Sequence, residues 1–380
     1  MQPLKGLKVL ELARILAGPW IGQVLADLGA TVIKLESPEG DDTRKWGPPF
    51  IERDGDTSAA YFYCCNRGKK SVTADLTTED GRALAHRLAG EADVLIENFK
   101  VGGLAKYGLD FDSLSPGNPG LVYCSVTGFG QTGPYAKRAG YDYLVQGMSG
   151  LMSITGDPAG EPQKVGVAVT DIFTGLYAVI AIQAALAQRE QTGRGQWIDM
   201  SLLDSGTAIL ANQAMNFLAT GTAPNRMGNE HPNIVPYQVF PCADGDIIIA
   251  SGNDRQYRSL CDILGRADLR DDPNYQANRQ RVDRRETLVP ILMAETRRWK
   301  KADLLARLES AQVAASPINS VAEVFDDPQI QARGLRISPD GVPGIRSPIA
   351  FSDSDLATDR TAPKLGEHTR EVIRNGFGTE

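Results

Sequence analysis

Asp171 is the carboxylate whose position in this sequence most favours covalent chemistry. It follows the glycine-bearing segment KVGVAVT and precedes residues 172–187, which are almost wholly apolar and predict a buried helix. An aspartate at such a start is a preferred N-cap, accepting a hydrogen bond from the amide of Phe173 or Thr174. It is equally suited to be a nucleophile, because the positive end of a helix keeps a carboxylate ionised at neutral pH. The two interpretations do not exclude each other.

Basic side chains cluster at two places in the sequence. Arg67, Lys69 and Lys70 come after two adjacent cysteines, and Lys100 and Lys106 follow a strand predicted at 93–98. Most such groups are ordinary solvated charges. At the carboxyl end of a parallel sheet, however, they are placed to bind phosphates.

Three arginines, Arg14, Arg44 and Arg138, lie beside glycine or proline turns, where a guanidinium can bind a substrate carboxylate through two hydrogen bonds. Each taken alone is more often structural. Arg138 also precedes Tyr141 and Asp142, where a helix is predicted to begin. Asp142 could cap that helix, and Tyr141 could pack in the core.

Two glycine-containing turns have different meanings. GFGQTG at 128–133 has dinucleotide-binding spacing, but Pro134 and a polar stretch follow it instead of an apolar helix. Without a helix N-terminus for a pyrophosphate, we expect neither nicotinamide nor flavin. SGNDRQY at 251–257 places Gly252 between a strand and a helix, as an ordinary turn or as a mobile cover of an active site.

The elements that would position these residues alternate between strand and helix. Strands at Val9–Leu12 and Thr31–Glu36 enclose a helix at Pro19–Leu28, and a helix at 78–88 and strands at 93–98 and 120–126 continue the pattern. This predicts an α/β fold with a mainly parallel sheet that binds its ligands at the carboxyl ends of the strands.

The chain divides at residues 219–236, which lose periodicity and gather Gly, Pro and Asn. A hairpin around Asp244-Gly245 and helices near 256–264, 285–298 and 301–312 follow. We therefore predict a large domain at 1–218, a linker and small α+β domain at 219–324, and a segment at 325–380 that returns to the large domain.

Composition restricts the class of protein. The 380 residues are 42% hydrophobic and 23% charged, as in globular proteins, and the net charge of −7 argues against general affinity for nucleic acid or anionic lipid. Five cysteines without CxxC spacing and three scattered histidines predict a reduced, cytoplasmic setting and no metal site. The sequence shows no secretory leader, and its longest apolar run, 176–187, is shorter than the roughly 20 residues of a membrane span.

Several stretches together resemble the family III coenzyme A transferases, which include formyl-CoA transferase, over essentially the whole chain. They are LKVLELARILAGPWIGQVLADLGATVIKLE, DDTRKWGPPF, NRGKKSV, ADVLIENFKVGGLAKYGL, YCSVTGFGQTGPYAKRAGYDYLVQGMSGLM, TDIFTGLYA and PKLGEHT. Each fragment is weak, but their order and spacing are highly specific. Within the family, YCSVTGFGQTGP, RAGYD, GLMSITG, IVPYQ and GNDRQ make the chain most similar to succinate-hydroxymethylglutarate CoA-transferase and related dicarboxylate enzymes.

The resemblance implies a Rossmann-like large domain, a smaller domain and an interlocked homodimer. It gives Asp171 the nucleophile position, with Tyr141 and Asp142 beside it. CoA, as co-substrate, is expected around Ala17, Gly18, Pro19, Lys70, Asn98, Phe99, Lys100 and Lys106. Leu16 replaces a glutamine of formyl-CoA transferase, and GNDRQ replaces its glycine run, so oxalate and formate specificity and glycine-loop gating do not carry over.

The implied reaction moves CoA from an acyl-CoA, such as succinyl-CoA, to a small carboxylic acid. The resemblance favours dicarboxylic acids and does not rank succinate, glutarate, malate, itaconate and hydroxymethylglutarate. Asp171 forms first an anhydride and then a thioester, with amides near Gly252 as oxyanion donors. Two alternatives stay open: an α-methylacyl-CoA racemase and a non-catalytic CoA-binding protein. The racemases carry a histidine in a GHD motif, whereas this chain has Tyr141, and an unperturbed tyrosine is a poor proton shuttle at neutral pH.

Overall fold

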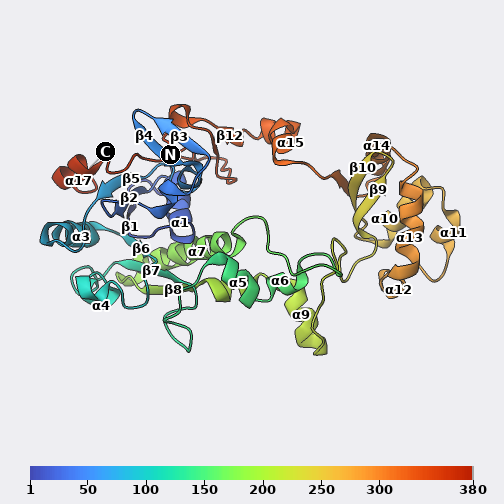
Figure 1. Ribbon diagram of the computed structural model, residues 1–380, viewed down its shortest axis with the longest axis horizontal. Coiled ribbons are helices and arrows are strands. Elements are labelled where there is room, and N and C mark those ends of the chain that lie inside the picture. Colours follow the sequence, from blue (N-terminus) through green and yellow to red (C-terminus); the bar gives the residue numbers. More distant parts are fainter. Residues whose placement is uncertain (379–380) are drawn as a thin grey trace. The chain divides into compact units, whose positions relative to one another are not determined.

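The computed structural model describes residues 1–378, which form two compact units (Figure 1). The first unit comprises residues 1–151, 164–222 and the chain from Pro328 onward. The second comprises residues 152–163 and 223–327. The chain therefore leaves the first unit twice, and the predicted segment 219–324 omits the earlier, short excursion.

A six-stranded parallel sheet forms the centre of the first unit, which confirms the predicted α/β class. Its order is β5-β2-β1-β6-β7-β8, the 3-2-1-4-5-6 order of doubly wound Rossmann sheets. The predicted strands lie within two residues of the observed ones, and β5 and β8 were not predicted. The strands are β1 (Lys8–Glu11), β2 (Thr31–Glu36), β5 (Lys70–Thr73), β6 (Val94–Glu97), β7 (Val122–Thr127) and β8 (Trp197–Ser201).

Helices cover both faces of this sheet (Figure 1). Val9 and Val32 pack in the core beside α1 (Ala17–Asp27) and α7 (Val169–Thr192). Their neighbours Leu10 and Ile33 pack in the opposite core, with α3 (Glu79–Glu91), α4 (Phe111–Leu114) and α17 (Thr369–Asn375). This alternation along each strand is what buries both faces of a parallel sheet.

Helix α7 is long and apolar enough to span a membrane, but one of its sides packs in the core against the sheet. Ala178, Ile182 and Ala185 are buried there. Its other side is exposed in the single chain, so the helix is not buried all round as the apolar run predicts. The exposed residues are Phe173, Leu176, Tyr177 and Ile180.

The second unit combines a three-stranded antiparallel sheet with helices around a separate core. The predicted hairpin is present as β9 (Tyr237–Cys242) and β10 (Gly245–Ala250), and β11 (Ala315–Pro317) pairs with β10. The helices are α10 (Asp254–Ile263), α11 (Ala267–Asp271), α12 (Asn278–Asp283), α13 (Arg285–Thr296), α14 (Lys301–Ser310) and α15 (Val321–Asp326).

Shorter elements complete the chain. The C-terminal segment lies beside β5. There the backbone N–H of His368 donates to the carbonyl oxygen of Ser71 at 2.9 Å. The remaining elements are β3 (Phe50–Arg53), β4 (Asp56–Ala59), α2 (Ala60–Tyr63), α5 (Asp142–Met148), α6 (Leu151–Ile154), α8 (Leu202–Ala208), α9 (Ala211–Thr220), α16 (Pro328–Ala332), β12 (Arg336–Ile337), β13 (Gly344–Ile345) and 3-10 turns at Asp42–Lys45, Ala105–Tyr107 and Pro339–Gly341.

Candidate active site

A cavity of about 550 Å³ lies at the carboxyl ends of β1, β6 and β7 in the first unit. The turn 14–17 follows β1, the segment 98–101 follows β6, and Thr127 ends β7; all three line the cavity. The strand order reverses between β1 and β6, and open parallel sheets bind their ligands at such a switch point.

Asp171 lines this cavity from the first turn of α7. The predicted N-cap role is wrong, because the helix begins two residues earlier and Ala168 is the N-cap. The Asp171 side chain is only 8% exposed, and within residues 1–378 no hydrogen bond to it is found. The carboxylate is therefore held in the cavity wall without a structural partner.

The pKa of Asp171 differs from the expectation of full ionisation. Burial, and then the charge of Asp142, raise it to about 7. The favourable end of the helix dipole does not compensate for the loss of water around the carboxylate. Once ionised, this poorly solvated group is more basic than an ordinary aspartate.

Asp142 caps the helix that carries Asp171. Its Oδ1 accepts from the backbone N–H of Thr170 at 2.8 Å and from the Thr170 hydroxyl at 2.6 Å, while its Oδ2 accepts from the Gln146 amide at 2.7 Å. The prediction that Asp142 caps its own helix is wrong, since α5 has no side-chain cap. The hydrogen bonds instead join the start of α5 to the start of α7.

Tyr141 lines the cavity and is 59% exposed, so the alternative that it packs in the core is wrong. A close backbone contact positions it. A Cβ atom added to Gly128 would lie 2.5 Å from the Cα of Gly140, so both positions need glycine. The first glycine of GFGQTG thus brings the chain before Tyr141 against the end of β7.

Five basic side chains line the cavity, which makes its rim favourable for phosphates and carboxylates. Some have additional contacts: the Arg14 guanidinium pairs with Asp42 at 3.1 Å, and that of Arg138 lies 4.3 Å from the centre of the Tyr135 ring. The sequence prediction did not include Lys137. The full set is Arg14, Lys100, Lys106, Lys137 and Arg138.

Of the predicted CoA-binding positions, Ala17, Asn98, Phe99, Lys100 and Lys106 line the cavity. Other predicted residues do not. Gly18 and Pro19 are buried in the first turn of α1, and the Lys70 ammonium pairs with Glu371 at 2.8 Å.

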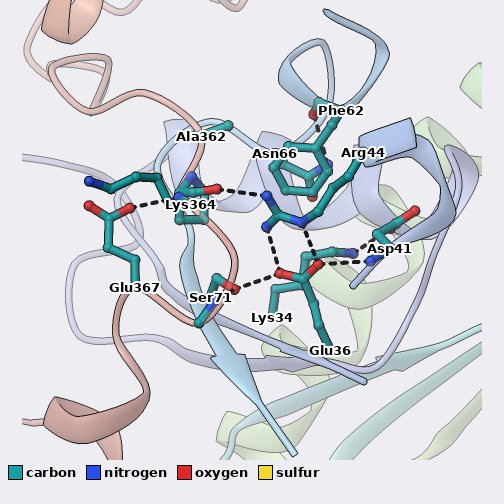
Figure 2. A network of polar contacts seen from close by, with 12 residues as sticks. Lys34, Glu36, Asp41, Arg44, Phe62, Asn66, Ser71, Ala362, Lys364 and Glu367 are labelled. Carbon is teal, nitrogen blue, oxygen red and sulfur yellow. Dashed lines mark hydrogen bonds and ion pairs between the residues drawn. The ribbon is translucent and has the colours of Figure 1, made fainter. Parts of the chain in front are cut away.

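Arg44 cannot bind a substrate carboxylate, which corrects that prediction. Its guanidinium is buried and binds both carboxylate oxygens of Glu36, at 2.7 and 2.9 Å, as Figure 2 shows. Gly252 lies between β10 and α10 of the second unit, and its N–H donates to the side-chain oxygen of Gln256 at 2.9 Å. That amide therefore already has an acceptor within its own turn.

Sequence reasoning missed Tyr61. It lies in the aromatic segment YFY, which resembles no catalytic motif. Burial, and then the charge of Asp171, raise the pKa of its phenol, so Tyr61 is neutral at physiological pH. The ring of Trp46 packs edge-on against Tyr61, with 5.4 Å between the ring centres.

Known proteins resemble this chain in sequence and in fold. Residues 4–369 match the profile described as CoA-transferase family III. The chain belongs to this family. A succinate–glutarate CoA-transferase of Agrobacterium fabrum is 59% identical and aligns over 98% of this chain and 95% of its own. A succinyl-CoA:glutarate CoA-transferase of Mus musculus is 41% identical over 98% of this chain and 86% of its own.

A solved structure shares the fold of this family III enzyme. It is a CaiB/BaiF family protein from Brucella suis, 60% identical, with a TM-score of 0.89 over 98% of this chain and 99% of that chain. The predicted family and the transferase class are therefore confirmed, and the co-substrate is a CoA thioester.

Proposed function

We propose that this enzyme transfers CoA from succinyl-CoA to a small dicarboxylic acid through covalent intermediates on Asp171. The observation that carries the proposal is the Asp171 carboxylate itself, which is buried, has a raised pKa and lies in a cavity rimmed by cations. Relatives that act on succinyl-CoA and glutarate support the choice of substrates.

The reaction proceeds through four acyl-transfer steps. Asp171 attacks the thioester carbonyl of the donor, forming a mixed anhydride and releasing CoA thiolate. The thiolate attacks the aspartyl carbonyl, which releases the donor carboxylate and leaves an aspartyl-CoA thioester. The acceptor carboxylate attacks this thioester to form a second anhydride and thiolate. The thiolate then attacks the acceptor acyl group, so that a new acyl-CoA leaves and the aspartate is regenerated.

The cavity supplies binding for both substrates. We assign Ala17, Asn98 and Phe99 to contacts with CoA, and Lys100 and Lys106 to its phosphates. Lysines form point-charge contacts with phosphate and favour the anionic form of a bound thiol. Tyr141 and Asp142 support the nucleophile, the first as a wall of the cavity and the second through its cap of α7.

A dicarboxylic substrate brings a second, distal carboxylate that needs its own cation. Arg14 and Arg138 are the two arginines in the cavity wall, and we propose that one of them binds this group. Planar guanidinium groups match the two oxygens of a carboxylate.

The exposed apolar residues of the first unit support the proposed homodimer. Tyr143 and Leu144 on α5, and Leu176 and Ile180 on α7, are each more than 40% exposed. Neighbouring apolar side chains of this kind mark an interface, and a second copy would cover them. We place the dimer in the cytoplasm, since all five cysteines are free thiols.

A substrate panel tests the proposal. The purified enzyme is incubated with succinyl-CoA and each of several mono- and dicarboxylic acids, and new thioesters are identified by mass spectrometry. We expect a dicarboxyl-CoA and an equal amount of free succinate, both lost in Asp171→Ala. Exchange of solvent deuterium into the α-carbon of an acyl-CoA without an acceptor acid would instead indicate a racemase. Absence of any product would indicate a binding protein.

A further inference from the structure

The cavity wall contains a strained residue. Ile15, in the turn between β1 and α1, has a φ of +73°. A β-branched side chain is strongly disfavoured in this left-handed region. The surrounding structure must therefore hold the turn in place, and such strain is concentrated where a site depends on one backbone conformation.

The backbone of the turn is held at several atoms. The N–H of Ile15 donates to the carboxylate of Asp41, 3.3 Å from each oxygen, and the carbonyl of Ala13 accepts from the Lys34 ammonium at 2.7 Å. Between them, the side chain of Asn98 bonds to both the N–H and the carbonyl of Arg14, at 2.9 and 2.7 Å. The turn is thereby tied to the proposed CoA-binding segment after β6.

Asp41 and Lys34 belong to a buried charge cluster together with Glu11 and Lys69; all four are fully buried. The Lys34 ammonium lies 2.9 Å from Asp41 and 3.0 Å from Glu11 (Figure 2 shows Lys34 with Asp41). Lys69 pairs with Glu11 at 2.8 Å and also donates to the carbonyl of Pro19 at 2.8 Å. Two cations thus balance two anions among these four residues, and Glu36, which is paired with Arg44, adjoins them through the N–H of Asp41.

Buried ion pairs of this kind are often replaceable by apolar side chains without loss of net stability. Taking four charges out of water offsets most of what their attraction contributes, and apolar side chains of similar size would stabilise a core as well. What apolar side chains cannot do is bind the N–H of Ile15 and the carbonyls of Ala13 and Pro19 at fixed positions.

We propose that Asp41 is a positioning residue, which together with Lys34 holds Ile15 left-handed and so fixes the cavity wall formed by residues 14–17. The inference rests on the proposed function in one respect: the cavity that residues 14–17 line is taken to bind the CoA thioester. Asp41 itself does not line the cavity and acts through the backbone of Ile15.

The test measures Asp41→Asn in two backgrounds, with Ile15 present and with Ile15→Gly. Glycine adopts a positive φ without strain, so it should make the turn independent of its support. We expect Asp41→Asn to lower kcat/KM about tenfold with Ile15, the fold-change that corresponds to the strain of one left-handed residue. In the Ile15→Gly background the further loss should be about twofold or less, because little strain remains.

A buried ion pair elsewhere gives the control. Asp27 binds Arg67 through two hydrogen bonds, at 2.6 and 3.0 Å, away from the turn. We expect both Asp27→Asn and Asp41→Asn to lower the melting temperature, because each leaves a buried cation without its partner, but we expect Asp27→Asn to leave kcat/KM nearly unchanged below that temperature. Equal losses for Asp41→Asn in both backgrounds, or an equal loss of kcat/KM in Asp27→Asn, would overturn the proposal.

CoA binding by calorimetry provides a readout that does not require turnover. Asp41→Asn should weaken CoA binding with Ile15 and not in the Ile15→Gly background. Failure of acyl transfer in the unmodified enzyme would refute the proposed function and leave this comparison intact. If Asp41→Asn does not fold, Asp41→Glu, which keeps the charge and moves the carboxylate, is measured in the same two backgrounds with the same expected difference.

Discussion

The charge of Asp142 raises the pKa of Asp171, while the same carboxylate caps the helix that carries Asp171. One side chain thus fixes where the nucleophile lies and makes its ionised form less stable. Burial is the larger of the two causes of the raised pKa. The two aspartates are therefore unequal partners, one bound by hydrogen bonds and one without them.

Replacing Asp142 by Asn should shift the pH profile of the enzyme. The amide oxygen still accepts from Thr170, but the negative charge is gone, so the pKa of Asp171 falls from about 7. The rise of kcat/KM with increasing pH should then begin at lower pH in Asp142→Asn. A pH profile with an unmoved acidic limb would contradict the electrostatic coupling.

Asp171→Asn should stabilise the protein above neutral pH. The folded-state pKa of about 7 lies above the ordinary value of 3.8, so the folded state binds the proton more tightly and loses stability as pH rises between these values. The substitution removes a penalty of up to about 4 kcal/mol. Thermal unfolding should show a higher midpoint than the unmodified protein at pH 8 and no difference near pH 4. A pH-independent difference would argue against the raised pKa.

Gly128→Ala should disrupt the site through the backbone. Its Cβ would lie 2.5 Å from the Cα of Gly140, which forces the segment before Tyr141 away from β7. We expect a lower melting temperature and a large loss of kcat. Gly90→Ala is the matched control, since an added Cβ there meets nothing within 4 Å and a helix favours alanine. Equal behaviour of the two variants would contradict the close-contact argument.

Arg14→Gln and Arg138→Gln distinguish the two candidates for the distal carboxylate. Loss of a charged hydrogen-bonded partner should raise KM for a dicarboxylic acceptor by about 10- to 100-fold. The same variant should change KM for a monocarboxylic acceptor little, whereas an arginine that binds CoA would affect both. If neither variant discriminates between the acceptors, neither arginine binds the distal group.

Ile180→Glu should weaken the proposed homodimer, because Ile180 is 64% exposed on the apolar side of α7. Ile373→Glu is the control: this residue is also exposed, but it lies on α17. Sedimentation velocity should show monomers at low concentration for Ile180→Glu and dimers for Ile373→Glu. A monomeric unmodified protein, or an unaffected Ile180→Glu dimer, would contradict this interface.

The sequence predicts the parts of this fold that depend on local pattern. The strands at 9–12 and 31–36 are short and mostly apolar, and the helix between them is followed by a glycine, so the local pattern is sufficient to locate them. Strand β5 was missed because its sequence, KSVT, is short and partly polar. Its pairing partner in the sheet, β2, lies far away in the sequence. The excursion at 152–163 was missed for the same reason, since only tertiary contacts define it.

The sequence predicted several residues of the site, but it did not predict which side chains they bind. Asp171 lies near a helix start, as the sequence indicates, yet its cap role belongs to Asp142, 29 positions earlier in the chain. Arg44 and Lys70 have the same local appearance as the cavity cations, and only the fold shows that Glu36 and Glu371 neutralise them. Neither pairing has a signal in the sequence, because the partners come together only when the strands assemble.

The most direct test of covalent transfer is mass spectrometry of the enzyme after incubation with succinyl-CoA and rapid quenching. The account predicts a CoA thioester on the peptide that contains Asp171, which hydroxylamine converts to a hydroxamate at that residue and which is absent in Asp171→Ala. An enzyme that transfers CoA at full rate with no labelled Asp171, or a variant without this carboxylate that still turns over, would contradict it.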